Sequence, residues 1–354
     1  RPLSAAPMSR FDASREAELR AWLHRLDQPV LDPSSLRIAA SDASPRRYWR
    51  LDDRTGSSWV VMDAPPVDND LRSFLDVGER LIAAGLRAPR CLARNTQQGF
   101  LLLEDLGPQT YLPALQAAQR EAEPAQADRL MRCAIDSLVQ LQSRARTEGL
   151  TPYSPALIRQ EIELFADWCV QREHGVVWGE RERRQWASVG EALVGAFAEQ
   201  PQVLVHCDFM PRNLMLPPQG SAAPGLLDFQ DALHGPAGYD LVSLLRDAFI
   251  SWDEAQELDW AVRYWEAARK AGIGWSADFG ECWRLMEWTA LQRHLRILGV
   301  FCRLKHRDAK PHYLDDLPRF FAYAVKTASR YRELKPLLPL LEQLRPGVTQ
   351  QAYG

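Results

Sequence analysis

The pattern of hydrophobic and polar positions in the first hundred residues predicts one helix followed by a small sheet. Four apolar residues recur at helical spacing between residues 9 and 27, which indicates an amphipathic helix. Short apolar segments bounded by Asp, Ser, Gly or Pro then predict strands, with a helix over 70–84 among them. The strands are expected at 36–40, 47–51, 58–62, 90–94 and 99–103. The order β-β-β-α-β-β indicates a small α+β lobe.

The pattern changes after residues 104–108, and from there it is mostly helical. Helices are expected at 124–146, 154–173, 182–199, 238–250, 253–271, 278–305, 315–331 and 335–344. Short strands interrupt them between Val203 and Asp228. The chain therefore predicts two domains, 1–105 and 106–354, of which the first is rich in strands and the second in helices. We expect a ligand site at their junction, where such sites are common.

Composition and charge exclude several classes of protein. The chain is 46% hydrophobic and 25% charged, which is ordinary for a soluble globular protein. Its net charge of −3, without long basic runs, gives no reason to expect nucleic acid or an anionic membrane as partner. No stretch reaches the ~20 apolar residues of a membrane helix. The six cysteines are scattered, without metal-site or redox spacing, and are expected to be reduced thiols.

These features predict a cytoplasmic protein. Residues 1–7 precede Met8 and lack the apolar centre of a signal peptide. We interpret them as a possible cloning remnant and leave them out of the fold prediction.

One stretch, Val203–Asp240, concentrates the candidate chemistry. An apolar run ends in His206-Cys207-Asp208, Asn213 follows five residues after Asp208, and a second apolar run ends at Asp228. Phosphoryl transfer needs a carboxylate that orients the nucleophile and oxygen ligands for Mg²⁺. Asp208 can accept a proton from a substrate hydroxyl, while Asn213 and Asp228 hold Mg²⁺ on a nucleotide. The alternative is a chance Asp-x4-Asn spacing beside a packed loop histidine.

Asp240, at the end of the same stretch, has a structural role in this hypothesis. We expect its carboxylate to accept backbone N–H bonds and so tie the catalytic loop together, with His206 as a further structural support. An ion pair or a helix cap is the alternative role for Asp240.

The catalytic stretch resembles a known kinase fold. His206-x-Asp208-x4-Asn213, followed by Asp228-Phe229-Gln230, is similar to the aminoglycoside/choline phosphotransferase branch of that fold. The similarity is sharper to bacterial kinases that phosphorylate the anomeric hydroxyl of N-acetylmuramic acid and N-acetylglucosamine in cell-wall sugar recycling. The segments that carry it are Ser41-Asp42-Ala43-Ser44-x-Arg46-Arg47-Tyr48, Val61–Pro66, Gly99–Gly107 and Leu291–Leu295.

The resemblance implies an α+β, two-lobed protein-kinase-like fold, with a small β-rich N-lobe that binds the nucleotide and a larger helical C-lobe. It implies ATP and Mg²⁺ as cofactors, Asp208 as catalytic base, and Asn213 and Asp228 as metal ligands. The turn over the phosphates would contain Ser41, Ala43 and Ser44. The backbone of Glu104 and Leu106 would bind the adenine edge.

The phosphate-binding lysine of the wider kinase pattern is absent. Its strand offers Met62 and Asp63 instead, so another cation must face the phosphates. Arg46 or Arg47 is the candidate, because a guanidinium can bind two phosphate oxygens at once. Solvated positions in the hairpin are the alternative for both.

Two groups are candidates for substrate binding, for which a small-molecule amino sugar is expected. Gln230, Asp231 and His234 follow the metal ligand and can hydrogen-bond sugar hydroxyls. Arg293 and His294, with Arg296 on the same helix, can bind the lactyl carboxylate of muramic acid; the alternative is a solvated charged face. A protein substrate is disfavoured, because Met210 replaces the basic residue that protein kinases carry two positions after the catalytic Asp.

The sequence therefore predicts an ATP- and Mg²⁺-dependent sugar kinase. The alternatives are a kinase of the same fold that acts on an aminoglycoside, choline or homoserine, and a nucleotide-binding regulator without activity. The sequence does not indicate the oligomeric state.

Overall fold

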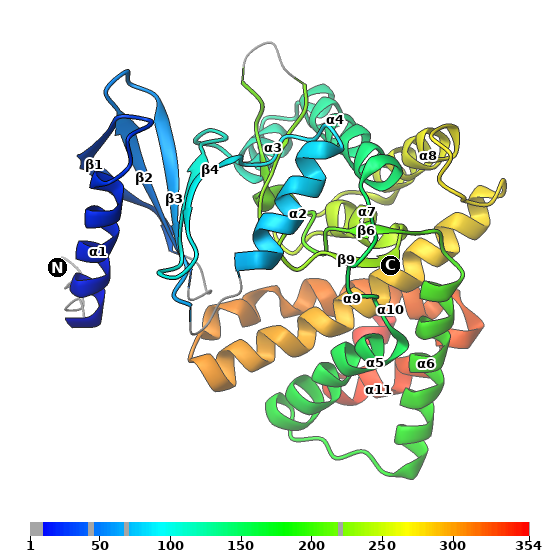
Figure 1. Cartoon of the computed structure of the whole chain (residues 1–354). Coiled ribbons are helices and arrows are strands. Elements are labelled where there is room, and N and C mark those ends of the chain that lie inside the picture. The colour runs from blue at the N-terminus through cyan, green and yellow to red at the C-terminus, as the bar shows by residue number, and fades with distance from the viewer. Residues whose placement is uncertain (1–9, 42–45, 67–70, 219–221, 354) are drawn as a thin grey trace. The chain divides into compact units, whose positions relative to one another are not determined.

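The structure is a computed structural model that describes residues 10–41, 46–66, 71–218 and 222–353. Its contacts divide the chain into two compact units. The first comprises Arg1–Ile82 and Arg87–Pro108, and the second comprises Ala83–Leu86 and Gln109–Gly354. Figure 1 shows the sheet of the first unit and the helices of the second. The division at Pro108 lies within a few residues of the change in the hydrophobic pattern.

The first unit is built on a five-stranded antiparallel sheet with the strand order β1-β2-β3-β5-β4. Its elements are α1 (Arg10–His24), β1 (Leu31–Ser41), β2 (Arg47–Asp53), β3 (Ser58–Asp63), α2 (Leu71–Ala83), β4 (Cys91–Asn95) and β5 (Phe100–Glu104). All seven were predicted from the sequence. β1 begins five residues earlier than expected, and its pairing with β2 is irregular between Asp32 and Arg37.

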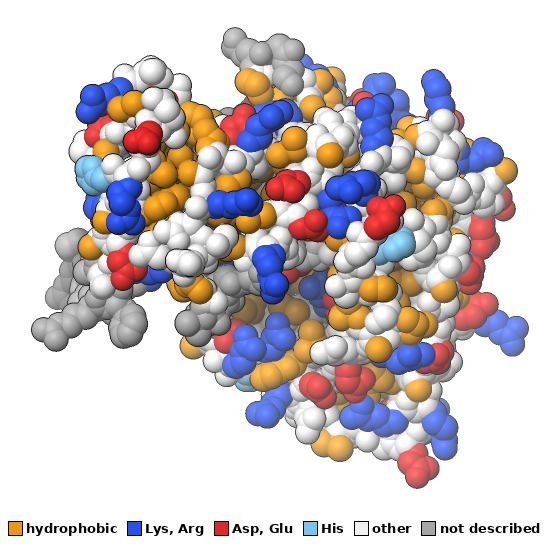
Figure 2. Space-filling model, viewed as in Figure 1, with side chains coloured by type: hydrophobic (Ala, Val, Ile, Leu, Met, Phe, Trp, Pro, Cys, Tyr) orange, Lys and Arg blue, Asp and Glu red, His pale blue; other side chains and the backbone are white. Residues whose placement is uncertain are grey.

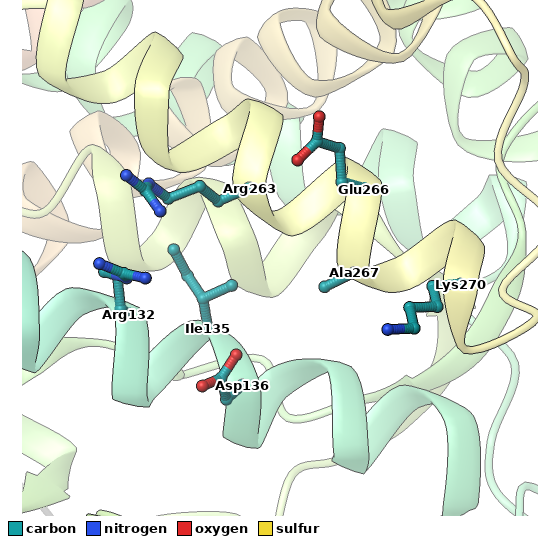
Figure 3. A pocket seen from close by; sticks show the side chains of 7 residues that line it. All are labelled: Arg132, Ile135, Asp136, Arg263, Glu266, Ala267 and Lys270. Carbon is teal, nitrogen blue, oxygen red and sulfur yellow. The ribbon is translucent and has the colours of Figure 1, made fainter.

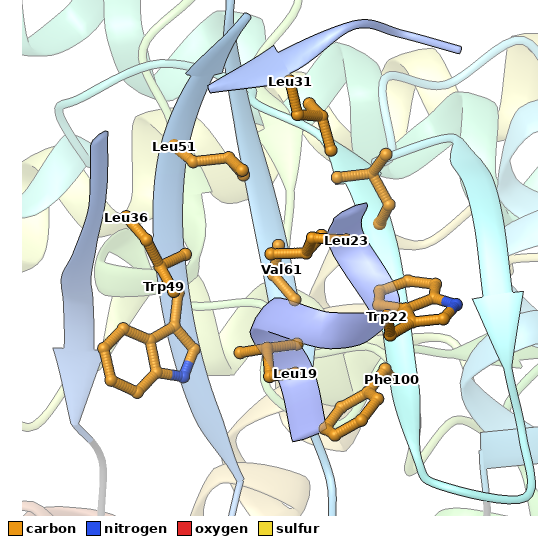
Figure 4. Packing of buried hydrophobic residues seen from close by; sticks show 10 residues of the cluster. Leu19, Trp22, Leu23, Leu31, Leu36, Trp49, Leu51, Val61 and Phe100 are labelled. Atoms are coloured by element: carbon orange, nitrogen blue, oxygen red, sulfur yellow. The ribbon is translucent and has the colours of Figure 1, made fainter. Parts of the chain in front are cut away.

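The core of the first unit lies between α1 and the sheet. Leu19, Trp22 and Leu23 of the helix pack with strand residues such as Val61 and Phe100 (Figure 4). Burying each such side chain contributes about 1.5–3 kcal/mol, so helix and sheet stabilise one another. Spacing of three and four residues places the helix side chains on one face, which is why the amphipathic pattern predicted this contact.

The second unit is mostly helical. Its helices are α3 (Tyr111–Arg120), α4 (Pro124–Arg144), α5 (Pro155–Leu164), a π-helical segment (Phe165–Glu173), α6 (Glu180–Ala198), α7 (Gly238–Leu245), α8 (Glu254–Lys270), α9 (Phe279–Asp308), α10 (Leu317–Arg330) and α11 (Leu337–Leu344). The long helix α9, orange in Figure 1, contacts α5, the π-helical segment, α6, α7 and α10. It is the central element of this unit.

Two short strand pairs interrupt the helices. β6 (Gln202–Val205) pairs with β9 (Leu233–Pro236), and β7 (Leu214–Met215) pairs with β8 (Gly225–Leu226), both antiparallel. A single 3₁₀ turn, Pro211–Asn213, precedes β7. These strands position the loops that carry the candidate catalytic residues.

The surface of the molecule is charged and mixed. Figure 2 shows basic and acidic side chains interspersed over the visible face, in keeping with the small net charge. Among the residues that the structure describes, every helix is too short or too polar to span a bilayer.

Candidate functional site

The second unit brings Asp208, Asn213 and Asp228 together. The side-chain nitrogen of Asn213 donates to the carbonyl of Asp208 at 2.9 Å and lies 3.5 Å from Oδ2 of Asp228. Asn213 is the last residue of the 3₁₀ turn Pro211–Asn213, and the Leu227 amide donates to its carbonyl at 3.0 Å. The β7–β8 pair thus delivers Asp228 beside the loop after β6. Spacing alone had grouped these three residues, and the fold places them in one site.

Two non-glycine residues of this site have a left-handed backbone. Cys207 has a φ of +76° and Asp228 a φ of +59°. Such conformations cost roughly 1–3 kcal/mol each and persist only where surrounding contacts fix them. The Asp228 carboxylate accepts a hydrogen bond from Gln230 Nε2 at 2.7 Å, which holds its side chain next to the strained backbone.

Asp240 is hydrogen-bonded to the backbone of the loop that carries Asp208. Its carboxylate is fully buried and accepts the backbone N–H groups of His206 at 2.7 Å and Cys207 at 3.0 Å. Burial raises the pKa of Asp240 to about 7, while these two hydrogen bonds lower it. The contacts of Asp240 are therefore those of a residue that holds the backbone, whereas Asp208 is half-buried at the surface of the loop.

His206 shapes the backbone of Asp208. The ring is fully buried and packs edge-on against Phe209, with 5.8 Å between the ring centroids. Its Nδ1 accepts the N–H of Asp208 at 3.2 Å. Burial lowers the pKa of His206, so the imidazole is neutral around pH 7 and acts as an acceptor.

Arg293 of helix α9 contacts the same loop from the other side. It is buried, and its Nη1 donates to the Cys207 carbonyl at 3.0 Å and lies 3.3 Å from the Tyr239 hydroxyl. The guanidinium also lies over the Tyr239 ring, 5.5 Å from its centroid. Asp240 and Arg293 together satisfy both the N–H and the carbonyl of Cys207. These contacts favour a role for Arg293 in positioning the loop, in place of the substrate contact expected from the sequence.

The expectation that His294 binds substrate is corrected by its burial. Its ring is fully buried, stacked on Tyr323 with 4.7 Å between centroids, and lies 5.4 Å from the ring of Phe320. Burial also lowers its pKa far below the usual range, so the ring is uncharged. Its side chain packs between α9 and α10 and does not reach the surface. Adjacent helix residues point in different directions, which explains why its neighbour Arg293 faces the loop.

The other candidate substrate residues follow Asp228 in the chain, and Gln230 contacts it. Gln230 is half-buried beside Asp228, and Asp231 is exposed. His234 is half-buried on β9, where its backbone N–H donates to the Thr151 carbonyl at 2.9 Å. The three residues therefore lie on the segment that leads from Asp228 into β9.

The candidate nucleotide residues lie in the first unit. Ser41 ends β1, and its backbone pairs with Arg47 of β2. Ala43 and Ser44 fall outside the described residues, as does the side chain of Ser41. Arg46 is buried, at 9% exposure, whereas Arg47 is exposed.

At the other candidate nucleotide segment, Glu104 ends β5 and Leu106 is mostly buried. The carboxylate of Asp105, between them, accepts hydrogen bonds from Arg50, Ser58 and the Gly107 amide. The bond from the Gly107 amide fixes the backbone after Asp105, and the bonds from Arg50 and Ser58 fix its side chain.

The strand that lacks a lysine has its own electrostatic arrangement. Met62 is fully buried, and Asp63 is 2% exposed. Arg15 of α1 donates to the Asp63 carboxylate at 2.8 Å and lies over the Phe100 ring, 4.3 Å from its centroid. Arg15 could not be identified from the sequence, because nothing in its spacing connects α1 with the end of β3.

A pocket of ≈ 270 Å³ lies elsewhere, between α4 and α8 (Figure 3). It is lined by Arg132, Ile135, Asp136, Arg263, Glu266, Ala267 and Lys270. Its lining contains none of the residues brought together around Asp208. Its charged side chains project from two exposed helix faces, so we assign it no role in catalysis.

Comparison with known proteins shows the family to which this chain belongs. The model of the phosphotransferase enzyme family matches residues 35–279. The N-acetylmuramate/N-acetylglucosamine kinase of Pseudomonas aeruginosa is 44% identical over 346 residues, which cover 95% of this chain and 98% of that protein. The protein of the same name from Pseudomonas putida is 43% identical over 313 residues, with 88% and 89% coverage.

The fold is also that of a solved kinase. An ethanolamine kinase from Plasmodium vivax matches with a TM-score of 0.62 at 10% identity, over 91% of this chain and 90% of that one. This likeness confirms the predicted kinase-like α+β fold. The matched residues include most of the strand-rich unit and the loop that carries Asp208. The chain belongs to the phosphotransferase enzyme family.

Proposed function

We propose that this kinase transfers the γ-phosphate of ATP to the anomeric hydroxyl of N-acetylmuramate and N-acetylglucosamine. The observation that carries the proposal is the convergence of Asp208, Asn213 and Asp228 on one loop that Asp240 holds in place. The names of the relatives at 43–44% identity support the choice of amino sugars. Because ATP is the donor, we also place the reaction in the cytoplasm, on amino sugars recovered from the cell wall.

Asp208 orients and deprotonates the acceptor hydroxyl. It is half-buried, and within the described residues no donor is hydrogen-bonded to its carboxylate, which leaves both oxygens for substrate. An anomeric hydroxyl is more acidic than an ordinary alcohol, so a carboxylate of normal basicity suffices as proton acceptor. The strained Cys207 backbone and the His206 acceptor fix where the carboxylate points.

Asn213 and Asp228 fit a divalent metal. The Asn213 side-chain nitrogen is committed to the Asp208 carbonyl, so its oxygen faces the other way and is available as a ligand. Asp228 adds a half-buried carboxylate, and Mg²⁺ prefers such oxygen ligands. When bound, Mg²⁺ would offset the negative charge of the nucleotide phosphates. No group of three or more His, Cys, Asp or Glu side chains that could hold a metal occurs in the described part of the chain, so this pair is the candidate.

The first unit would supply the nucleotide contacts. We assign the adenine edge to the backbone of Glu104 and Leu106, which the Asp105 hydrogen bonds hold in place. In place of the absent lysine, an arginine of the 46–47 pair would face the phosphates. Arg47 is the better placed of the two, because it is exposed and Arg46 is buried.

The proposal is tested by a turnover assay with purified protein, ATP and MgCl₂. N-acetylmuramate, N-acetylglucosamine, choline, homoserine and an aminoglycoside are offered as acceptors, and ³¹P NMR locates the phosphate on the product. Both amino sugars should be phosphorylated at O1. The methyl glycoside of N-acetylglucosamine lacks only the reacting hydroxyl and should give no product. Turnover of choline, homoserine or the aminoglycoside with neither amino sugar would contradict the proposal.

A further inference from the structure

Helix α9 directs two arginines toward the catalytic loop, and their surroundings differ. Arg293 is buried and bonded to the Cys207 carbonyl. Arg296, one turn further along, has 30% of its side chain exposed. Both guanidinium groups reach the hydroxyl of Tyr239, at 3.3 Å from Arg293 and 3.0 Å from Arg296. The two cations therefore share one buried acceptor, but only Arg296 extends to the surface.

The guanidinium of Arg296 is held in one orientation. Its Nε lies 3.4 Å from Oε1 of Glu161, and its Nη1 donates to Tyr239. Glu161, on α5, is itself fixed by Gln292 Nε2 at 2.9 Å and by the hydroxyl of Tyr153. A guanidinium fixed on two sides loses little conformational entropy when it binds a further group.

One edge of this guanidinium is left for a ligand. Among the residues that the structure describes, none accepts a hydrogen bond from Arg296 Nη2. Arg296 and Arg293 both contact the Tyr239 hydroxyl, and Arg293 donates to the carbonyl of Cys207, the residue before Asp208. A half-exposed cation thus lies beside the loop where the sugar must be held.

We propose that Arg296 is a specificity-determining residue, whose Nη2 edge binds the lactyl carboxylate that N-acetylmuramate carries and N-acetylglucosamine lacks. The inference rests on the proposed function and adds to it the residue that distinguishes the two sugars. Glu161 orients Arg296 and does not itself touch the substrate. Arg293 lies three residues before Arg296 on the same helix, but it positions the loop and should affect both sugars equally.

The test compares kcat/KM for the two sugars in the wild type and in Arg296→Gln. For N-acetylmuramate we expect a loss of about 10- to 100-fold, the range for losing a charge-assisted hydrogen bond. For N-acetylglucosamine the expected loss in kcat/KM is much smaller, about threefold at most, because this sugar has no carboxylate for Arg296 to bind. Arg296→Lys keeps the charge and should retain part of the preference. Equal losses for both sugars, or no loss for either, would overturn the inference.

Arg293→Lys is the matched control on the same helix. Its effect should fall on kcat and be equal for the two sugars, because it loosens the loop and not a substrate contact. A selective loss for N-acetylmuramate in this variant would assign the carboxylate to Arg293 and overturn the inference. Thermal unfolding of each variant shows that the fold is retained.

A substrate modification separates binding from structure. The methyl ester of N-acetylmuramate removes the negative charge of the carboxylate and adds one methyl group. In the wild type it should lose about as much kcat/KM as Arg296→Gln loses with the free acid, and in the variant acid and ester should be equivalent. An ester penalty that persists in Arg296→Gln would overturn the inference. If the wild type phosphorylates neither sugar, the proposed function itself fails, which is a distinguishable result.

Discussion

At the scale of single residues, burial assigns different tasks to similar side chains. Asp208, the proposed base, is half-buried, whereas Asp240 is fully buried and accepts two backbone N–H groups. The sequence identified both, because each follows a recognisable motif. It could not assign Arg293, because the contact with Cys207 joins residues 86 positions apart and depends on how α9 packs. The sequence also could not show that the His294 side chain is buried between α9 and α10, because this too depends on how α9 packs.

The hydrogen bonds from the His206 and Cys207 amides to Asp240 predict a loss of stability when Asp240 is substituted. At pH 5 Asp240 is protonated, and both of its oxygens still face the two backbone N–H groups, whereas in Asp240→Asn only one of these groups can meet a side-chain oxygen. Leaving a buried donor without a partner costs about 1–3 kcal/mol, so the free energy of unfolding should fall by that amount. Urea titration at pH 5 measures it. An unchanged urea midpoint in Asp240→Asn would show that these two hydrogen bonds do not stabilise the fold.

The raised pKa of Asp240 predicts how this loss changes with pH. The pKa rises from an unfolded value near 3.8 to about 7 in the folded protein, so the folded state binds this proton more tightly. Between those values the free energy of unfolding contributed by Asp240 falls as pH rises. The stability difference between wild type and Asp240→Asn should therefore shrink from pH 5 to pH 7. A stability difference that grows from pH 5 to pH 7 would contradict the raised pKa of Asp240.

At the scale of elements, hydrophobic period predicted most of the fold. The helix expected at 278–305 is α9, Phe279–Asp308, and all five sheet strands were located. Helix α3 was not predicted; Pro113 lies in its first turn, where proline is tolerated. The predicted helix 154–173 instead divides into α5 and a π-helical segment at Phe165. Periodicity does not reveal that change, because it arises where another helix crosses.

The close contact between α9 and the backbone at Leu164 and Phe165 predicts that a larger residue at Gly299 destabilises the protein. A Cβ at Gly299 would lie 2.3 Å from the Leu164 carbonyl carbon and 2.5 Å from the Phe165 nitrogen, so the helices must separate. Gly299→Ala should lower the free energy of unfolding by about 1–3 kcal/mol, the cost of overpacking.

Gly195→Ala in α6 is the matched control, because its Cβ would meet nothing within 4 Å. There, alanine should stabilise the helix by roughly 0.5–1 kcal/mol. Chemical denaturation of both variants measures the contrast. Equal effects at the two positions would contradict the close crossing at Gly299.

At the scale of the whole molecule, the change of pattern near residue 105 lies close to the division of the chain at Pro108. The proposed base and metal ligands, Asp208, Asn213 and Asp228, all belong to the second unit. The sequence could name these groups through a family resemblance. It could not show that Asp63, where a lysine was expected, is paired with Arg15.

The proposed metal site at Asn213 and Asp228 predicts a metal-dependent stabilisation by nucleotide. A ligand that binds only the folded state at about 100 times its Kd adds about 2.7 kcal/mol. ATP with Mg²⁺ should therefore raise the Tm of the wild type more than ATP with EDTA. In Asp228→Asn this difference should disappear, because a charged metal ligand is lost. A variant that keeps the full Mg²⁺ effect would remove Asp228 from the metal site.

The measurement that tests the central claim most directly is the kcat of Asp208→Asn with N-acetylglucosamine, taken together with the Kd for ATP. The substitution preserves the size of the side chain and removes only the proton acceptor. The account predicts that kcat falls by about 10²- to 10⁴-fold, the usual contribution of a general base, while the Kd for ATP stays close to that of the wild type. A folded Asp208→Asn variant that turns over the sugar at the wild-type rate would contradict it.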